Sequence, residues 1–214
     1  EMVKNGQTAL MGLKYAPFPV VSAMSGMALG GGCEINLHAD AVQAHVESYP
    51  GLVEVGVGVI PGWGGCKEMI LRCTGVDQSK ATEKPSGFFG GLKNAATALV
   101  TMPAIGKAFE TISMAKVAGS AEEARDSGIL NAKSRISMNR ARLLQDAKDL
   151  CLDLAKDYAP PHPVYVSLPG KTGKAALMMA VENFVSNGKA TAHDKVVCEA
   201  LASVLSGGDT DMTD

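Results

Sequence analysis

The feature that most constrains the fold is a glycine-rich turn that joins an apolar, β-branched run to a helical run. Val20 to Met24 predicts a short buried strand, because β-branched and aliphatic side chains pack well on a pleated sheet. The segment 25–32 follows and predicts a turn, since its glycines allow a close backbone approach. Helical character resumes over 33–39. A strand followed by a turn and a helix indicates an α/β fold rather than an all-α one.

The rest of the sequence predicts further helices and strands. Prolines at 17 and 19 end a first helix over 2–14. Further strands are expected over 40–45 and 53–60, and further helices from 67, over 143–154, over 175–185 and from 191 to 206. We therefore predict an α/β core over 1–132, with an insertion at about 74–105, and a helical region over 133–214.

Charge and cysteine content exclude several classes of function. A formal net charge of −2, with scattered lysines and arginines, provides no basic surface for nucleic acid or an anionic membrane. The five cysteines include no C-x-x-C pair and the four histidines are dispersed, so we expect no metal site. Free cysteines, and no long apolar run or signal peptide, predict a cytoplasmic protein.

Two glutamates near the glycine-rich turn are candidates for chemistry. Glu34 follows the glycines in an apolar stretch, and Glu54 lies between Val53 and Val55. Amides at the start of a helix can stabilise developing negative charge, and two carboxyl groups in apolar settings can act as general acid and base. Spacing alone leaves a structural alternative open, in which the glycines only allow close strand–helix packing and Glu34 only interacts with the helix dipole.

Two blocks of the sequence resemble the enoyl-CoA hydratase/isomerase (crotonase) superfamily. Residues 19–34 resemble the pattern P-V-[IV]-A-A-x-x-G-x-A-x-G-G-G-x-E, and residues 54–65 resemble E-x-x-x-G-x-x-P-G-x-G-G. Both blocks occur in order at the usual separation. The segment 107–130 is similar to a later helix and strand of the family. The insertion and the helical region look most like the hydratase portion of bacterial multifunctional 3-hydroxyacyl-CoA dehydrogenases of fatty-acid β-oxidation.

The resemblance implies a fold, a reaction and roles for five residues. The fold would be a partial crotonase-type ββα spiral core followed by a helical C-terminal region, and the reaction the hydration of trans-2-enoyl-CoA to 3-hydroxyacyl-CoA. Gly31 would donate its N–H to the thioester oxygen in an oxyanion hole. Glu34 and Glu54 would activate water and transfer the proton. Gly30 and Gly62 would contact the substrate or the catalytic water.

The same resemblance implies particular ligands and partners. An acyl-CoA thioester would be the substrate, and this chain would bind no metal and no cofactor. NAD would be needed only by an attached dehydrogenase unit. We expect a homo-oligomer that associates, covalently or non-covalently, with such a unit.

Two departures from the family pattern lead to further expectations. Val53 stands where the family has proline, so the path of that loop is open. The chain begins at Glu1, downstream of the place where the family's first oxyanion donor lies, so we expect a fragment that is inactive in isolation. Two alternatives are an enoyl-CoA isomerase of the same superfamily, which needs one acid, and a non-catalytic structural or oligomerisation module.

Overall fold

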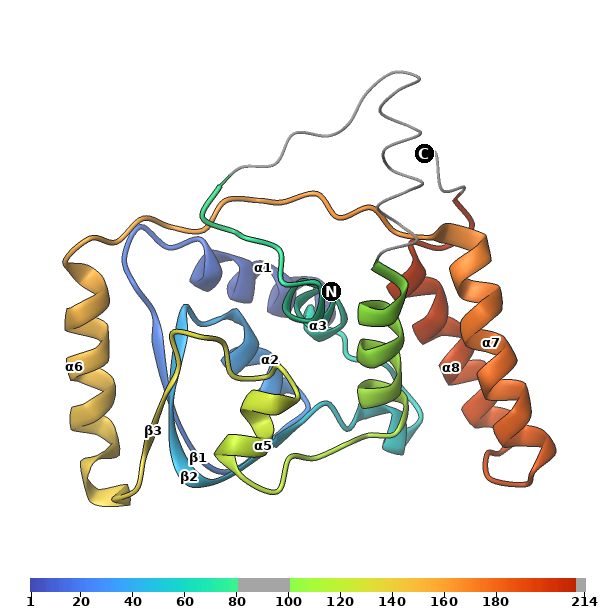
Figure 1. Cartoon of the computed structure of the whole chain (residues 1–214), viewed down its shortest axis with the longest axis horizontal. Helices are drawn as coiled ribbons and strands as arrows, with labels where there is room; N and C mark the ends of the chain where they lie inside the picture. Colours follow the sequence, from blue (N-terminus) through green and yellow to red (C-terminus); the bar gives the residue numbers. More distant parts are fainter. Residues whose placement is uncertain (81–100, 211–214) are drawn as a thin grey trace.

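The computed structural model describes residues 1–80 and 101–210 and shows a small parallel sheet with helices packed around it (Figure 1). The sheet contains β1 (Val21–Leu29), β2 (Ala41–Gly51) and β3 (Arg135–Ser137) in that spatial order. β1 pairs with β2 and β2 pairs with β3, both in parallel. This architecture confirms the predicted α/β class.

β1 is longer than the sequence pattern predicted, because residues 25–29 continue the strand. The turn expected over 25–32 is therefore wrong for its first half. The register with β2 shifts between Met24 and Gly26. Gly26 has a φ of +67°, which L side chains rarely adopt, so the strand absorbs an irregularity there instead of ending. The true turn is at Gly30, also at positive φ, directly before the next helix.

α2 (Gly31–His38) connects β1 to β2, and α3 (Gly65–Thr74) follows a loop after β2. The strand expected over 53–60 is wrong. Instead, a short 3-10 helix, η1 (Glu54–Val57), ends at Gly58 in the left-handed conformation. Glycines at 56 and 58 weaken an extended conformation and favour a tight bend, which turns Glu54 toward the glycine-rich turn.

Helices form much of the remaining described chain. They are α1 (Met2–Lys14), α5 (Ala121–Asp126), the 3-10 helix η2 (Arg140–Arg142), α6 (Leu143–Ala155), α7 (Gly170–Ser186) and α8 (Ala192–Ser206), together with a helical segment over 101–113. As predicted, Thr191 caps α8, in a reciprocal pair of hydrogen bonds with Asp194. No helix within the described ranges is long and apolar enough to cross a membrane.

The insertion expected at about 74–105 falls mostly on residues 81–100, which lie outside the described residues. Its last residues, 101–105, belong to the helical segment 101–113, in which Ile105 is fully buried. The strand implied near the end of 107–130 is also wrong. Ile129 and Leu130 lie in a bend after α5 and are buried. They anchor this irregular connection in the core.

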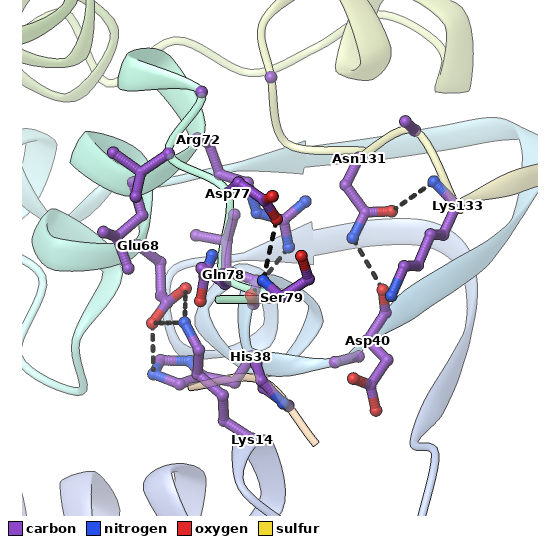
Figure 2. Close-up of a pocket in the computed structure, with 18 of the residues that line it drawn as sticks. Lys14, His38, Asp40, Glu68, Arg72, Asp77, Gln78, Ser79, Asn131 and Lys133 are labelled. Atoms are coloured by element: carbon purple, nitrogen blue, oxygen red, sulfur yellow. Dashed lines mark hydrogen bonds and ion pairs between the residues drawn. The ribbon is translucent and has the colours of Figure 1, made fainter. Parts of the chain in front are cut away.

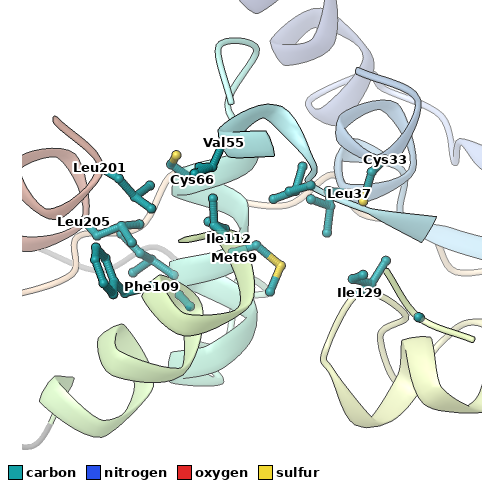
Figure 3. Packing of buried hydrophobic residues seen from close by; sticks show 14 of the residues in the cluster. Cys33, Leu37, Val55, Cys66, Met69, Phe109, Ile112, Ile129, Leu201 and Leu205 are labelled. Carbon is teal, nitrogen blue, oxygen red and sulfur yellow. The ribbon is translucent and has the colours of Figure 1, made fainter. Parts of the chain in front are cut away.

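One cluster of buried apolar side chains joins the sheet region to the C-terminal helices (Figure 3). It includes Leu37 of α2, Met69 of α3, Ile112 and, from α8, Leu201 and Leu205. All five side chains are almost completely withdrawn from solvent. The cluster therefore crosses the boundary expected at residues 132–133, and the C-terminal helices help to position the elements that carry the candidate site.

Candidate active site

Glu34 is held in one orientation by the loop that precedes α3. It lies in the first turn of α2 and is only 2% exposed. Its carboxylate oxygen Oε1 accepts the backbone N–H groups of Trp63 and Gly65, both at 2.8 Å. A buried carboxylate is costly without such donors, so these two amides both stabilise Glu34 and fix its position.

Glu54, unlike Glu34, accepts no hydrogen bond from the described residues. It begins η1, and both of its carboxyl oxygens are buried without a hydrogen-bond partner in the described part of the chain. Burial raises the pKa of Glu54, and the negative charge of Glu34 raises it further. A carboxyl group of this kind retains its proton closer to neutral pH, as a general acid requires.

A glycine lies against each glutamate, Gly30 against Glu54 and Gly65 against Glu34. A Cβ atom at Gly30 would be 3.5 Å from Oε1 of Glu54, and one at Gly65 would be 3.0 Å from Oε1 of Glu34. A side chain at Gly65 would force Glu34 to shift, whereas at Gly30 the contact with Glu54 would be an ordinary one and the positive φ of +55° is what disfavours a side chain. The structure thus brings Glu34, Glu54 and Gly30 together, although they come from α2, η1 and the end of β1.

Gly31 is the first residue of α2, so its N–H is one of the helix's initial amides, which have no intrahelical acceptor. No side chain caps this helix. The indole of Trp63 covers the same place: a Cβ at Gly31 would lie 3.0 Å from Cζ3 of Trp63. On its other side the indole contacts Gly6 of α1 so closely that any side chain there would collide with it. Two glycines therefore create the space for Trp63.

Gly62 lies on the loop 58–64, which forms one wall of an apolar cavity of about 850 Å³. The other walls come from α1 and α8, with His38 of α2 and Cys66 and Lys67 of α3. The carbonyl oxygen of Gly62 accepts a hydrogen bond from Nε2 of Gln7 at 2.8 Å, which ties the loop to α1. Trp63 lines the cavity as well, so the loop that holds Glu34 also borders this space.

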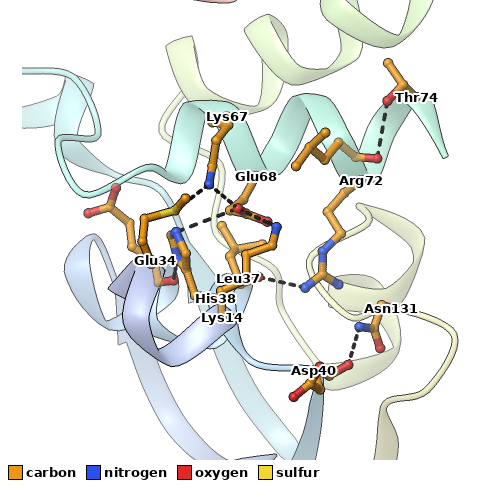
Figure 4. A network of polar contacts seen from close by, with 12 residues as sticks. Lys14, Glu34, Leu37, His38, Asp40, Lys67, Glu68, Arg72, Thr74 and Asn131 are labelled. Atoms are coloured by element: carbon orange, nitrogen blue, oxygen red, sulfur yellow. Dashed lines mark hydrogen bonds and ion pairs between the residues drawn. The ribbon is translucent and has the colours of Figure 1, made fainter. Parts of the chain in front are cut away.

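A buried polar network lies behind Glu34, between α1, α2 and α3 (Figure 4). Nδ1 of His38 donates to the backbone carbonyl of Glu34 at 2.7 Å. Burial lowers the pKa of His38, which favours the neutral ring. Both oxygens of Glu68 accept from Nζ of Lys14 at 2.7 Å, and Nζ of Lys67 lies 2.8 Å from one of them. Burial alone would raise the pKa of Glu68, but the two ammonium groups hold it below its usual value.

The sequence analysis did not assign this network a role. One signal was present, because His38 follows Glu34 by four positions and residues at that spacing are neighbours on a helix. The partners Lys14 and Glu68 are 54 positions apart, and no local pattern connects them.

A second cavity, of about 540 Å³, borders the same network and is lined by both polar and apolar side chains (Figure 2). Arg72 donates to the carbonyl of Leu37 at 2.9 Å, and Asn131 to the carbonyl of Asp40 at 2.8 Å. Neither Glu34 nor Glu54 lines this cavity. It is therefore separate from the candidate active site.

The thiols and acids near the site do not form a metal centre. Within residues 1–80 and 101–210, no group of three or more His, Cys, Asp or Glu side chains is placed to hold a metal ion. Burial raises the pKa values of Cys33 and Cys66 to about 12, and the charges of Glu34 and Glu54 contribute to both. These thiols stay protonated near neutral pH, so they are not nucleophiles.

Comparisons with known proteins agree with this geometry. Residues 1–84 match the model of the enoyl-CoA hydratase/isomerase family. A Bacillus subtilis protein named "Probable 3-hydroxyacyl-CoA dehydrogenase" is 40% identical over 208 residues, which are 97% of this chain and 24% of that protein. A short-chain-enoyl-CoA hydratase from Clostridium acetobutylicum is 37% identical over 75 residues, 35% of this chain and 28% of the hydratase. The chain thus spans about a quarter of the length of these relatives.

The fold is also similar to that of solved structures. The crystal structure of an enoyl-CoA hydratase from Bacillus anthracis superimposes with a TM-score of 0.51 and 23% sequence identity. The match covers 95% of this chain and 59% of the hydratase. At this level of identity, the similarity shows a crotonase-type fold.

Proposed function

The chain belongs to the enoyl-CoA hydratase/isomerase family through residues 1–84, and on that premise we propose that it carries an enoyl-CoA hydratase site. The reaction is the hydration of trans-2-enoyl-CoA to 3-hydroxyacyl-CoA. The observation that carries the proposal is the pair of carboxyl groups, Glu34 and Glu54, that lie in one buried region beside the amides of α2.

Adding water across a double bond needs one group that accepts a proton from water and one that gives a proton to carbon. Glu34, fixed by two backbone N–H groups, accepts the proton as the water oxygen forms its bond to C3. Glu54, whose pKa is raised by burial, donates its proton to C2. The product gains one hydroxyl and one hydrogen, and a proton then passes from Glu34 back to Glu54 to restore the starting state.

Negative charge develops on the thioester oxygen during this addition. The N–H of Gly31, at the positive end of α2, is the donor that this chain offers to that oxygen. One preorganised donor of this kind contributes roughly 3–4 kcal/mol in comparable acyl-transfer reactions. Gly30, against Glu54, and Gly62, beside Trp63, are proposed to contact the substrate and the attacking water. The chemistry requires an acyl-CoA and neither a metal nor a redox cofactor in this chain.

Hydration of crotonyl-CoA, followed by the loss of enoyl absorbance, tests the proposal. Glu34→Gln and Glu54→Gln should each lower kcat by roughly 100-fold or more, since each removes a proton-transfer group. Glu47→Gln is the matched control, because Glu47 is exposed and remote from the site. As the B. subtilis relative is about four times as long, both this chain and the native polypeptide that contains it are assayed. Full turnover in both glutamine variants of the native polypeptide would exclude the mechanism.

Isomerisation of 3-enoyl-CoA is the second candidate, because the matched family includes isomerases. Moving a proton between C2 and C4 needs only one carboxyl group, and burial raises the pKa of Glu54. Isomerase activity that survives Glu34→Gln but not Glu54→Gln would favour it. A structural or oligomerisation module, the third candidate, would neither bind acyl-CoA nor turn it over.

We also propose that the native protein acts in fatty-acid β-oxidation and joins this site to an NAD-dependent 3-hydroxyacyl-CoA dehydrogenase unit. The similarity to the B. subtilis protein over 97% of this chain supports this, as does the chemistry, since the hydration product is the substrate of such a dehydrogenase. Homo-oligomerisation is part of the same proposal. NAD reduction after addition of crotonyl-CoA, and light scattering of the native protein, are the corresponding measurements.

A further inference from the structure

His38 of α2 is a buried polar side chain to which the proposed reaction assigns no role. Its side chain has no exposed surface, and its Nδ1 lies 2.7 Å from the backbone carbonyl oxygen of Glu34 (Figure 4). A carbonyl oxygen only accepts hydrogen bonds, so the proton of the neutral imidazole is on Nδ1, and Nε2 carries a lone pair. One edge of the ring is therefore attached to the backbone of the proposed base.

The other edge of the ring lies against Gly64. A Cβ at Gly64 would be 3.0 Å from Nε2 and 3.1 Å from Cε1 of His38, which is tighter than an ordinary van der Waals contact. Gly64 is the N-cap residue of α3 and lies in the chain between Trp63 and Gly65, whose N–H groups hold the carboxylate of Glu34. One imidazole thus contacts both the backbone of Glu34 and the loop that orients its carboxylate.

Charged groups from α1 and α3 surround Nε2. Oε1 of Glu68 lies 3.7 Å from Nε2, and the ammonium groups of Lys14 and Lys67 compensate this carboxylate. Nε2 itself has no hydrogen-bond partner among the described residues. Burial lowers the pKa of His38, and the two lysines act in the same direction. The ring therefore stays neutral near pH 7 and keeps its place between Gly64 and the backbone of Glu34.

We propose that His38 is a positioning residue for Glu34, which holds the loop 58–64 at a fixed distance from α2 so that both backbone N–H groups reach the carboxylate. The inference rests on the proposed function and adds a residue to its site. His38 acts only through Glu34, because its ring has no exposed surface. A shift of about 1 Å in a reacting group can lower a rate by roughly 100-fold, so a small movement of this loop has a large effect.

The kinetic test uses two substitutions at His38 in the native polypeptide. His38→Asn keeps a donor for the carbonyl of Glu34 and removes the ring edge at Gly64, whereas His38→Phe keeps a ring and removes the donor. Each should lower kcat for crotonyl-CoA by roughly 10- to 100-fold and change KM less than about twofold, because alignment and not substrate binding is lost. His162→Asn and His162→Phe, at an exposed histidine, are the matched controls and should leave both constants unchanged.

Repeating His38→Asn in a Glu34→Gln background distinguishes positioning from a general loss of structure. If His38 acts through Glu34, the second substitution should lower kcat further by less than about twofold. A further reduction as large as that of the single variant would overturn the inference. So would an unchanged kcat in both single variants at His38.

NMR of this chain makes the test independent of the reaction. The imidazole proton of His38 should be on Nδ1 in the wild-type protein, a result that needs no variant. His38→Asn should shift the amide protons of Trp63 and Gly65 upfield, because their hydrogen bonds to the carboxylate weaken. Both results without any hydration would keep the positioning role and exclude the hydratase proposal. Hydration with the proton on Nε2, or with unshifted amides, would keep the hydratase proposal and overturn the role of His38.

Discussion

The two glutamates of the site differ in environment although they share one buried region. Glu34 has two backbone donors on one oxygen, whereas both oxygens of Glu54 lack a partner among the described residues. Two carboxyl groups that interact but have different surroundings tend to ionise at different pH values, which separates a base from an acid. The charge of Glu34 therefore influences the protonation of Glu54.

Glu34→Gln should lower the pKa of Glu54. Burial keeps that pKa raised in both proteins, but the variant removes a like charge that raises it further. At a fixed pH, a larger fraction of Glu54 is then ionised. The ¹³Cδ chemical shift of Glu54, followed through a pH titration by NMR, measures this directly. An unchanged or higher pKa in the variant would mean that the two carboxyl groups do not interact.

Gly65 and Gly32 provide a matched pair for testing how closely the backbone approaches Glu34. A Cβ at Gly65 would lie 3.0 Å from both Oε1 of Glu34 and Cδ2 of Leu52, whereas one at Gly32 has nothing within 4 Å. Gly65→Ala should lower the free energy of unfolding by about 1–3 kcal/mol. Gly32→Ala should raise it by about 0.4–1 kcal/mol. Urea unfolding measures both, and equal stability of the two variants would contradict the close approach.

At the scale of whole elements, α1 and α3 are joined by a buried ion pair. Lys14 is 5% exposed and Glu68 is 1% exposed, and the two are linked through both carboxylate oxygens. Pairs of this kind need not add stability over an apolar contact, but removing one partner leaves a buried charge uncompensated. Lys67, which is 42% exposed, can remain solvated without Glu68, whereas Lys14 cannot.

Glu68→Leu should therefore destabilise the protein by about 3–5 kcal/mol, because Lys14 is left buried without its counter-ion. Adding Lys14→Met should recover most of that loss. Urea unfolding of both single variants and the double variant gives the coupling free energy. Glu122→Gln, in an exposed pair with Arg125, is the control and should change stability by less than about 0.5 kcal/mol. A double variant as unstable as Glu68→Leu would show that packing, not charge, causes the loss.

At the scale of the whole molecule, sequence patterns predicted most element types but not how the elements meet. The α1, α6, α7 and α8 helices follow their apolar spacing and their Pro, Thr and Gly signals, and these are local properties. The segment 53–60 was predicted wrongly because its valines favour a strand, while its glycines and tertiary contacts select η1. Secondary-structure propensity predicts the backbone conformation poorly where tertiary contacts fix the position of a side chain in a loop.

The glutamates and glycines of the site could be found from the sequence because the two motifs are contiguous. The cavity and the Lys14–Glu68 pair could not, since they depend on contacts between residues far apart in the chain. Val196, Ala200 and Val204 recur at intervals of four in the sequence, but this spacing fits core packing equally well. Only the fold shows that it faces a cavity.

α8 contributes to the same apolar cluster as α2 and α3. Weakening the packing of α8 should therefore destabilise the whole described core. Leu201 is fully buried, and Leu201→Ala should lower the free energy of unfolding by about 2–5 kcal/mol. Hydrogen exchange should show the same loss for slowly exchanging amides of β1, β2 and α8. Unchanged protection of β1 and β2 would mean that the C-terminal helices unfold independently. Leu144→Ala, at a 77% exposed position of α6, is the control.

Trp63 is the single tryptophan of the chain, and its indole lies between Gly6 of α1 and Gly31 of α2 while it borders the cavity. The intrinsic fluorescence of the protein therefore comes chiefly from one place, next to the carboxylate of Glu34. A ligand that enters this cavity is expected to change the polarity around the ring, and with it the wavelength and intensity of its fluorescence. The protein thus contains its own optical probe, and binding can be followed in real time without a label.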